Sequence, residues 1–495
     1  MIARRAGPVL ALAATLIAGC TVGPHYTPPT PPAPPSANFV STTPSTASTD
    51  QPPGDWWRLY DTPALDQLVQ QALTHNTSLL AAAANLAEAR GALSLARAGL
   101  YPSTTISASA QYGVSPDQVF ANELLHEGTP SPGAYYSPGL DVSYELDLFG
   151  RIRQTIAARK ANLEAVQAAE DVTRVSVAGE TTRAFVNACA YAAERDVAER
   201  LLTLAHETTE TTVREARDGA ASALDVARAR EAEAQVRATL PTYEGQRRTA
   251  LFQLAVLTGD PPEMISKAAD DCRAPPKLTQ VLPVGDIQSL FKRRPDVREA
   301  ERQLASNVAL IDVATADLYP TITLNASASS AASSLSGLGA LSNLSYLVGP
   351  MLSWSFPNTL TAQAEIREAK GTASASYANF QAAVLQALQD TETALTDDTN
   401  ELARNADLVI ARDQSRTAFD LASKQYRDGS ISYLNLITAQ NDLINAEQTL
   451  AASNQALASD QVTLFKALGG GWEQAPVVTA PPIIDGRSGK SVPVR

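Results

Sequence analysis

The sequence contains the same unit twice. Ala98–Ala110 (AGLYPSTTISASA) matches Ala316–Ala328 (ADLYPTITLNASA), and later in each copy Arg217-Asp218-Gly219 matches Arg427-Asp428-Gly429. These matches occur in the same order and at nearly the same spacing, which predicts a tandem duplication. The predicted boundaries are a first copy over 63–260, an inter-repeat linker over 261–283 and a second copy over 284–470.

Each copy is predicted to carry two long helices joined by a tight turn. Residues 139–240 and 358–475 contain no proline and are rich in Ala, Glu, Gln, Arg and Leu, which favours helices. Aromatic residues make up only 6% of the chain, as expected of long Ala-rich helices rather than one thick core. Gly219 and Gly429 suit the left-handed position that ends a helix, so the turns are predicted near these residues. Ser-X-X-Asp and Ser-X-X-Asn patterns follow as N-caps: Ser222 with Asp225, and Ser432 with Asn435. Leucines at seven-residue spacing add a coiled-coil period in the second copy: Leu436, Leu443, Leu450, Leu457 and Leu464.

A different period precedes each long helix. Between 102 and 148, and again between 320 and 356, apolar and polar residues alternate, which predicts a pair of strands in each copy. Gly-, Pro- and Ser-rich loops, about 113–136 and 329–345, separate the two strands of each pair. One face of the second strand carries the acids Asp141, Glu145 and Asp147, whereas the other face is apolar and partly aromatic.

Such alternation fits a soluble sheet with one wet face, but strands of ~9–11 residues with this polarity are also typical of transmembrane barrels. Four strands cannot enclose a lumen, because closure requires about eight. A barrel therefore requires several chains. In it, Asp141, Glu145 and Asp147 would line the lumen.

The N-terminal region predicts export and attachment. Residues 1–19 have a positive start and a short apolar stretch, as in a signal peptide. Leu16–Cys20 resembles a bacterial lipobox, which would make Cys20 the lipid-carrying N-terminus; the alternative is an ordinary secretory signal with a chance cysteine. Residues 20–62 are proline-rich and predict an extended, poorly packed arm. Residues 471–495 are predicted to form a C-terminal tail. No run of eighteen apolar residues occurs after the signal.

Composition argues against several classes of function. The formal charge of −13 would repel nucleic acid. The four histidines share no ligand spacing, and no phosphate-binding loop or nucleophile elbow occurs, so neither a metal, a cofactor nor an enzymatic activity is predicted. Cys189 and Cys272 could bond in an oxidising compartment, but the sequence does not place them within reach of each other.

Several motifs together resemble one family, the TolC-like outer-membrane efflux proteins, in the lipoprotein branch that serves multidrug efflux. These motifs are Cys20 followed by Val22-Gly23-Pro24 and Tyr26, Leu-Tyr-Pro before each strand pair, and Asp147-Leu148-Phe149-Gly150 after the first. The resemblance implies a mainly α protein with transmembrane β-strands. Three chains of four strands would close one barrel in the outer-membrane lipid. Their helical hairpins would form a tunnel through the periplasm to an adaptor protein and an inner-membrane pump.

The resemblance also assigns roles at the two hairpin turns. Gly219 and Gly429 would contact the adaptor, or they merely cap their helices. Tyr426 and Asp225 would belong to the network that holds the periplasmic mouth closed, and charge attraction adds Arg427. Asp225 alternatively only stabilises the start of its helix.

The sequence departs from the family at the mouth itself. Relatives often have an acid there, whereas this chain has Thr438, with Asn435 a turn earlier and Leu434 as a possible apolar constriction. Amides and hydroxyls bind cations far less than a ring of carboxylates does. The sequence therefore does not predict that multivalent cations block the mouth.

The resulting hypothesis is a homotrimeric, lipid-anchored duct of the outer membrane that passively conducts drugs or other small toxic compounds. Its acidic lumen would prefer cations weakly. Two alternatives remain: a duct for type I protein secretion, and a structural coiled-coil lipoprotein or adaptor subunit that conducts nothing.

Overall fold

The computed structural model describes residues 22–24, 26–31, 38–42, 47–114, 116–126, 128–129, 131–278, 281–357, 359–484 and 491–492. The chain divides into two compact units. The sheet unit comprises residues up to Pro29, Glu88–Ala165 and Glu301–Asn379; the hairpin unit comprises Thr30–Ala87, Val166–Ala300 and the chain from Phe380 onward. The predicted lipid site, Cys20, lies outside the described residues. None of the described helices is both long enough and apolar enough to cross a membrane.

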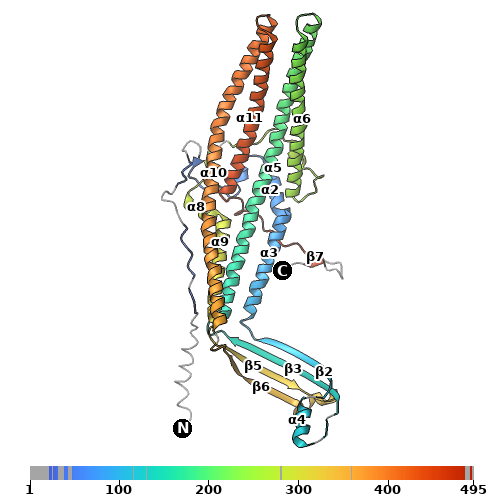
Figure 1. Ribbon diagram of the computed structural model, residues 1–495, viewed down its shortest axis with the longest axis vertical. Coiled ribbons are helices and arrows are strands. Elements are labelled where there is room, and N and C mark those ends of the chain that lie inside the picture. Colours follow the sequence, from blue (N-terminus) through green and yellow to red (C-terminus); the bar gives the residue numbers. More distant parts are fainter. Residues whose placement is uncertain are drawn as a thin grey trace. The chain divides into compact units, whose positions relative to one another are not determined.

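The sheet unit contains one four-stranded antiparallel sheet (Figure 1). Its strands are β2 (Ser103–Gly113), β3 (Gly133–Leu146), β5 (Thr321–Ser330) and β6 (Leu344–Ser353), in the order β2-β3-β5-β6. Each repeat therefore contributes one strand pair, as predicted. Among the described residues, the outer edges of β2 and β6 have no partner strand.

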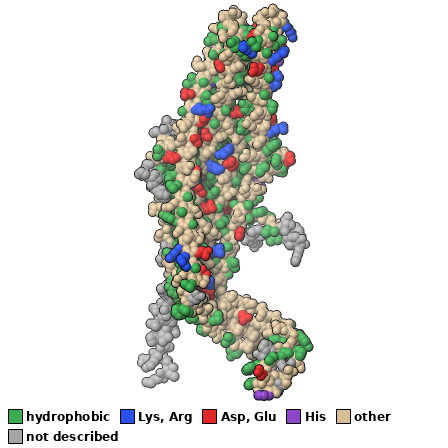
Figure 2. All heavy atoms as spheres, viewed as in Figure 1, with side chains coloured by type: hydrophobic (Ala, Val, Ile, Leu, Met, Phe, Trp, Pro, Cys, Tyr) green, Lys and Arg blue, Asp and Glu red, His purple; other side chains and the backbone are tan. Residues whose placement is uncertain are grey.

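The strand register separates an apolar face from a polar face. One row across the sheet joins Ile106, Leu140, Ala328 and Tyr346. The adjacent row, on the opposite face, joins Thr105, Asp141, Ser327 and Leu347. Because directly paired residues share a face, the predicted split between the faces extends across all four strands, with Leu347 and Met351 of β6 as apolar residues on the polar face. In the view of Figure 2, charged side chains are sparse over the strands and scattered along the helices.

Two strand ends and two loops differ from the prediction. Strand β3 ends at Leu146, because Asp147 accepts hydrogen bonds from the backbone N–H groups of Ile152 and Arg153, both at 3.0 Å. Asp147 thus caps the next helix and no longer belongs to the strand that was predicted to line the lumen. Beyond β6, Trp354 and Phe356 stack on each other at 4.6 Å. The loops predicted to be irregular contain the helix α4 (Pro116–Leu125) and the 3-10 turns η2 (Leu335–Gly339) and η3 (Leu341–Asn343).

The helices repeat in the same order in both copies. The first copy has α2 (Pro63–His75), α3 (Thr77–Ala98), α5 (Arg151–Arg217) and α6 (Ala223–Leu257). The second copy has α8 (Ile287–Arg293), α9 (Pro295–Ala316), α10 (Leu360–Arg427) and α11 (Tyr433–Ala467). The mainly helical fold with a small sheet is therefore confirmed.

Helix α6 runs past the proline that ends the predicted helical stretch. Pro241 lies inside the helix, which continues to Leu257. A proline in a helix interior costs about 3 kcal/mol. Beyond Pro241, Leu251 and Leu254 are almost fully buried in the core of the hairpin unit, and this burial favours continuation of the helix.

The proline-rich arm is partly packed, contrary to the prediction. Phe39 is buried in the core of the hairpin unit. The backbone N–H groups of Val40 and Ser41 donate to the two carboxylate oxygens of Glu392 at 2.8 and 2.9 Å. Strand β1 (Ala47–Ser48) pairs in parallel with β4 (Leu282–Pro283) in the inter-repeat linker. The 3-10 helix η1 (Trp56–Tyr60) follows, and Trp56 stacks on Phe465 at 4.8 Å.

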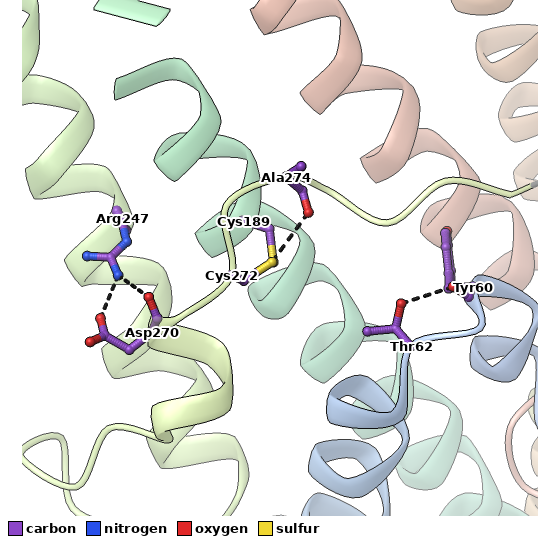
Figure 3. The surroundings of a disulfide bond; sticks show 7 residues. All are labelled: Tyr60, Thr62, Cys189, Arg247, Asp270, Cys272 and Ala274. Atoms are coloured by element: carbon purple, nitrogen blue, oxygen red, sulfur yellow. Dashed lines mark hydrogen bonds and ion pairs between the residues drawn. A yellow bond between two sulfur atoms is a disulfide. The ribbon is translucent and has the colours of Figure 1, made fainter. Parts of the chain in front are cut away.

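The inter-repeat linker is covalently tied to α5. Cys189 on α5 forms a disulfide with Cys272, just after the short helix α7 (Lys267–Asp270), and their Cα atoms are 5.1 Å apart (Figure 3). In the same region Arg247 on α6 pairs with Asp270 at 2.5 Å. The bond that the sequence did not decide is therefore present, and it holds the linker together with the Arg247–Asp270 ion pair and the β1–β4 pairing.

Buried carboxyl groups make the stability of the hairpin unit dependent on pH. Burial raises the pKa of Asp398 to about 6, and Asp398 is 2% exposed. A raised pKa stabilises the fold below about pH 4, where the group is protonated in both states, and this stabilisation is lost as the pH rises through about 6.

We expect Asp398→Asn to increase the free energy of unfolding at pH 7.5 by on the order of 2 kcal/mol and to flatten its dependence on pH. Denaturant unfolding between pH 5 and pH 8 measures this. Asp407→Asn, at an exposed position of the same helix, is the control. Equal pH profiles for Asp398→Asn and the wild type would contradict the expectation.

Candidate functional site

The turns of the two helical hairpins have the same backbone geometry. Gly219 and Gly429 have positive φ angles of 79° and 71°. The following N–H groups reach back to the preceding helix, from Ala220 to the Glu215 carbonyl at 2.8 Å and from Ser430 to the Gln425 carbonyl at 2.9 Å. Helix capping therefore requires both glycines. A Cβ atom at either would meet no atom within 4 Å, so both backbones are open to a partner. The adaptor contact stays a prediction.

Asp225 closes a capping box at the start of α6. Its carboxylate accepts from the Ser222 N–H at 3.0 Å and from the Ser222 hydroxyl at 2.7 Å. The Asp225 N–H donates to the Ser222 hydroxyl at 3.2 Å. The hydrogen bond from the Ser222 hydroxyl is the main cause that lowers the pKa of Asp225. The second turn differs, because the Ser432 side chain makes no capping bond.

Tyr426 joins the two hairpins. Its hydroxyl donates to the Glu215 carboxylate on α5 at 2.5 Å, and its ring packs edge-on against Tyr433 at 5.9 Å. Both rings belong to an apolar cluster between the hairpins with buried Ala229, Leu436 and others. Burial, and then the hydrogen bond to Glu215, raise the pKa of Tyr426, so it stays a neutral donor at physiological pH.

The partner of Tyr426 was not predicted. The sequence pointed to Asp225 and Arg427, but Asp225 is engaged in its own cap, and the Arg427 Nε donates to the Ser423 carbonyl of its own helix at 3.1 Å. A local signal for Glu215 exists: it is an acid in the last turn of a helix, where the macrodipole disfavours negative charge. Gln425 occupies the equivalent position in the second copy.

Three further predicted mouth residues share an exposed face of α11. Leu434, Asn435 and Thr438 are all exposed, and the Thr438 hydroxyl donates to the Leu434 carbonyl at 2.7 Å. Leu224, the equivalent of Leu434 in the first copy, is also exposed. These three positions therefore present apolar and neutral groups to solvent, and their place at the mouth stays a prediction.

The three acids predicted to line the lumen have different surroundings. Glu145 forms an ion pair with Arg151 at 2.5 Å, and Asp147 pairs with Arg153 at 3.0 Å. Within the described part of the chain, Asp141 makes no ion pair and lies on the polar face of the sheet. Only Asp141 therefore contributes an uncompensated negative charge there.

No metal site is formed by the residues that the structure describes. His206 contacts Glu233 at 3.1 Å, and His75 hydrogen-bonds within its own helix.

A sheet with one apolar face and two open edges, together with paired helical hairpins, is the architecture expected of a subunit of an oligomeric outer-membrane channel. The family model described as outer membrane efflux protein matches residues 68–260 and 287–470. The chain belongs to the outer membrane efflux protein family.

Individual relatives match over nearly their whole length. The toluene efflux pump outer membrane protein TtgC of Pseudomonas putida is 31% identical over 473 residues, covering 94% of this chain and 95% of TtgC. Nodulation protein T of Rhizobium leguminosarum bv. viciae is 28% identical over 489 residues, covering 97% of this chain and 95% of that protein. The solved structure of the outer-membrane channel OprN has a TM-score of 0.83 and 32% identity, covering 92% of this chain and 100% of OprN. The class expected from the sequence, an efflux channel of the outer membrane that extends into the periplasm, is thereby confirmed.

Proposed function

We propose that three copies of this chain close one twelve-stranded barrel, in which β6 of each copy pairs with β2 of the next. The open edges of β2 and β6 carry this proposal, because unpaired strand edges are not tolerated in hydrocarbon. The apolar row through Ile106, Leu140 and Tyr346 would face lipid, and the row through Asp141 would face the water-filled lumen.

The channel passes small toxic organic compounds outward and performs no chemistry of its own. The similarity to TtgC, named as part of a toluene efflux pump, supports this class of solute. An adaptor protein docks at the turns around Gly219 and Gly429, whose exposed backbones allow close approach. An inner-membrane pump supplies the energy. A lipid on Cys20 holds the chain in the outer membrane.

Single-channel recording of the purified full-length trimer in planar bilayers tests this function. We expect a conductance with a weak cation preference, measured as a reversal potential in a salt gradient. Asp141→Asn should move the reversal potential towards zero, whereas Asp147→Asn should change it less, because Asp147 is paired with Arg153. If neither the wild type nor a variant without the Tyr426 hydroxyl (Tyr426→Phe) passes current, the protein is a scaffold rather than a duct.

We propose further that the Tyr426–Glu215 hydrogen bond holds the periplasmic mouth closed. A hydrogen bond to a charged group contributes about 1.5–3 kcal/mol. Tyr426→Phe should therefore shift the closed–open equilibrium at least about tenfold per protomer and raise the mean conductance. Glu215→Gln removes the charge but leaves an amide oxygen that can accept the bond, so its shift should have the same direction and be smaller. Tyr433→Phe changes the neighbouring ring but leaves this bond intact, so it serves as the control. Wild-type conductance in both test variants would rule out the role of this bond.

A further inference from the structure

Residues 22–24 and Tyr26 lie along α9 in the sheet unit. At one end the Tyr26 hydroxyl donates to the Glu301 carboxylate. At the other end Gly23 lies so close to α9 that a Cβ atom there would be 1.9 Å from Oδ1 of Asp312. Its φ of +123° also favours glycine. Pro24 and Tyr26 border a cavity of about 270 Å³ whose apolar lining includes Val308.

These two contacts give the segment a direction. Glu301 and Asp312 are eleven residues apart on α9, which corresponds to about 16 Å along the helix. The chain therefore runs from Tyr26 back to Gly23 towards the C-terminal end of α9. At that end α9 ends at Ala316, and the next strand of the sheet, β5, begins at Thr321.

Aromatic side chains mark this junction as the expected membrane surface. Phe149 and Tyr319 stack at 4.6 Å. The Trp354 Nε1–H donates to the Leu318 carbonyl at 3.1 Å, and its ring stacks on Phe356. Aromatic residues gather at both interfaces of transmembrane barrels, and the apolar face of the sheet starts immediately beyond these pairs.

Chain length then limits where a lipid can be attached. Cys20 precedes Gly23 by three residues, so the covalent chain keeps it within about 11 Å of Gly23. From Asp312 to the end of α9 is about 6 Å. The segment points towards the junction, and this reach is long enough for Cys20 to attain the level where the aromatic pairs lie.

We propose that residues 22–24 and Tyr26 form a docking segment that holds acylated Cys20 at the membrane surface, level with the start of the sheet. The proposal rests on the lipid attachment proposed above. Gly23 and Tyr26 are positioning residues, since neither carries the lipid. The docking segment couples the anchor to the sheet that must enter the membrane.

Loss of docking should slow assembly. Without the docking segment, the next buried side chain of the arm among the described residues is Phe39, and a flexible chain of nineteen residues would have a mean span of about 25 Å. The effective concentration of the sheet at the membrane then falls about tenfold. Membrane insertion of the trimer should become slower by a similar factor.

Gly23→Ala tests this in the full-length protein in cells. Pulse-labelled protein is followed into heat-resistant trimers of the outer membrane, and the mass of the N-terminal peptide reports acylation. We expect Gly23→Ala to be acylated but to form trimers about tenfold more slowly. Tyr26→Phe should slow assembly less, and Pro28→Ala, at an exposed position just after the docking segment, should match the wild type. In a Cys20→Ser background, where no lipid is present to position, Gly23→Ala should cause no additional delay.

The outcomes separate the two proposals. An N-terminal peptide without acyl groups would refute the lipid attachment and, with it, the positioning role. An acylated Gly23→Ala protein that assembles at the wild-type rate would refute the positioning role alone. An equal delay of assembly by Gly23→Ala in the wild-type and the Cys20→Ser backgrounds would also refute the positioning role alone, because the defect would then lie in folding.

Discussion

Val348→Arg should abolish membrane assembly of the trimer. Val348 is 75% exposed on the single chain and lies on the apolar face of β6, opposite Ala326. Arginine on the lipid face of a barrel costs about 2–4 kcal/mol near the middle of the bilayer, and three copies would each contribute this cost. Heat-resistant trimers in outer-membrane fractions, and single-channel current from purified protein, measure the loss.

The adjacent residue provides a matched control. Leu347 is 72% exposed on the same strand, but it lies opposite Ser327 on the polar face. We expect Leu347→Arg to assemble normally and to weaken the cation preference, because its charge would lie in the lumen. If both variants fail equally, or if only Leu347→Arg fails, the assignment of the two faces is wrong.

Removing the Cys189–Cys272 disulfide should destabilise the hairpin unit by about 4.5 kcal/mol. The bond joins residues 83 positions apart in the sequence. A cross-link of this span lowers the conformational entropy of the unfolded chain, and the corresponding free energy has this size. Cys189→Ser with Cys272→Ser should therefore lower the midpoint of denaturant unfolding in the hairpin unit.

Reduction of the wild-type protein should reproduce the effect, whereas reduction of the double variant should change nothing further. Thiol labelling of the unfolded, unreduced wild type checks the bond itself. Reaction of Cys189 and Cys272 with maleimide there would show that they are not bonded.

Local sequence patterns predicted most of the architecture. Alternation with period two separates Leu140 from Asp141, and the strand register keeps that separation across the sheet. Gly219 and Gly429 end their helices where predicted, because a left-handed turn is a local requirement of the backbone. The predicted cap of Asp225 on Ser222 spans only three residues and also forms.

The sequence determined the repeated unit, the periods of its helices and strands, and the turns between them, because these depend on residues only a few positions apart. The tertiary structure decided which distant groups meet: Tyr426 with Glu215, Cys189 with Cys272, and Gly23 with Asp312. It also decided that Asp147 caps a helix instead of extending a strand. Packing of whole helices against one another fixes such contacts, and no local period in the sequence records which side chains that packing brings together.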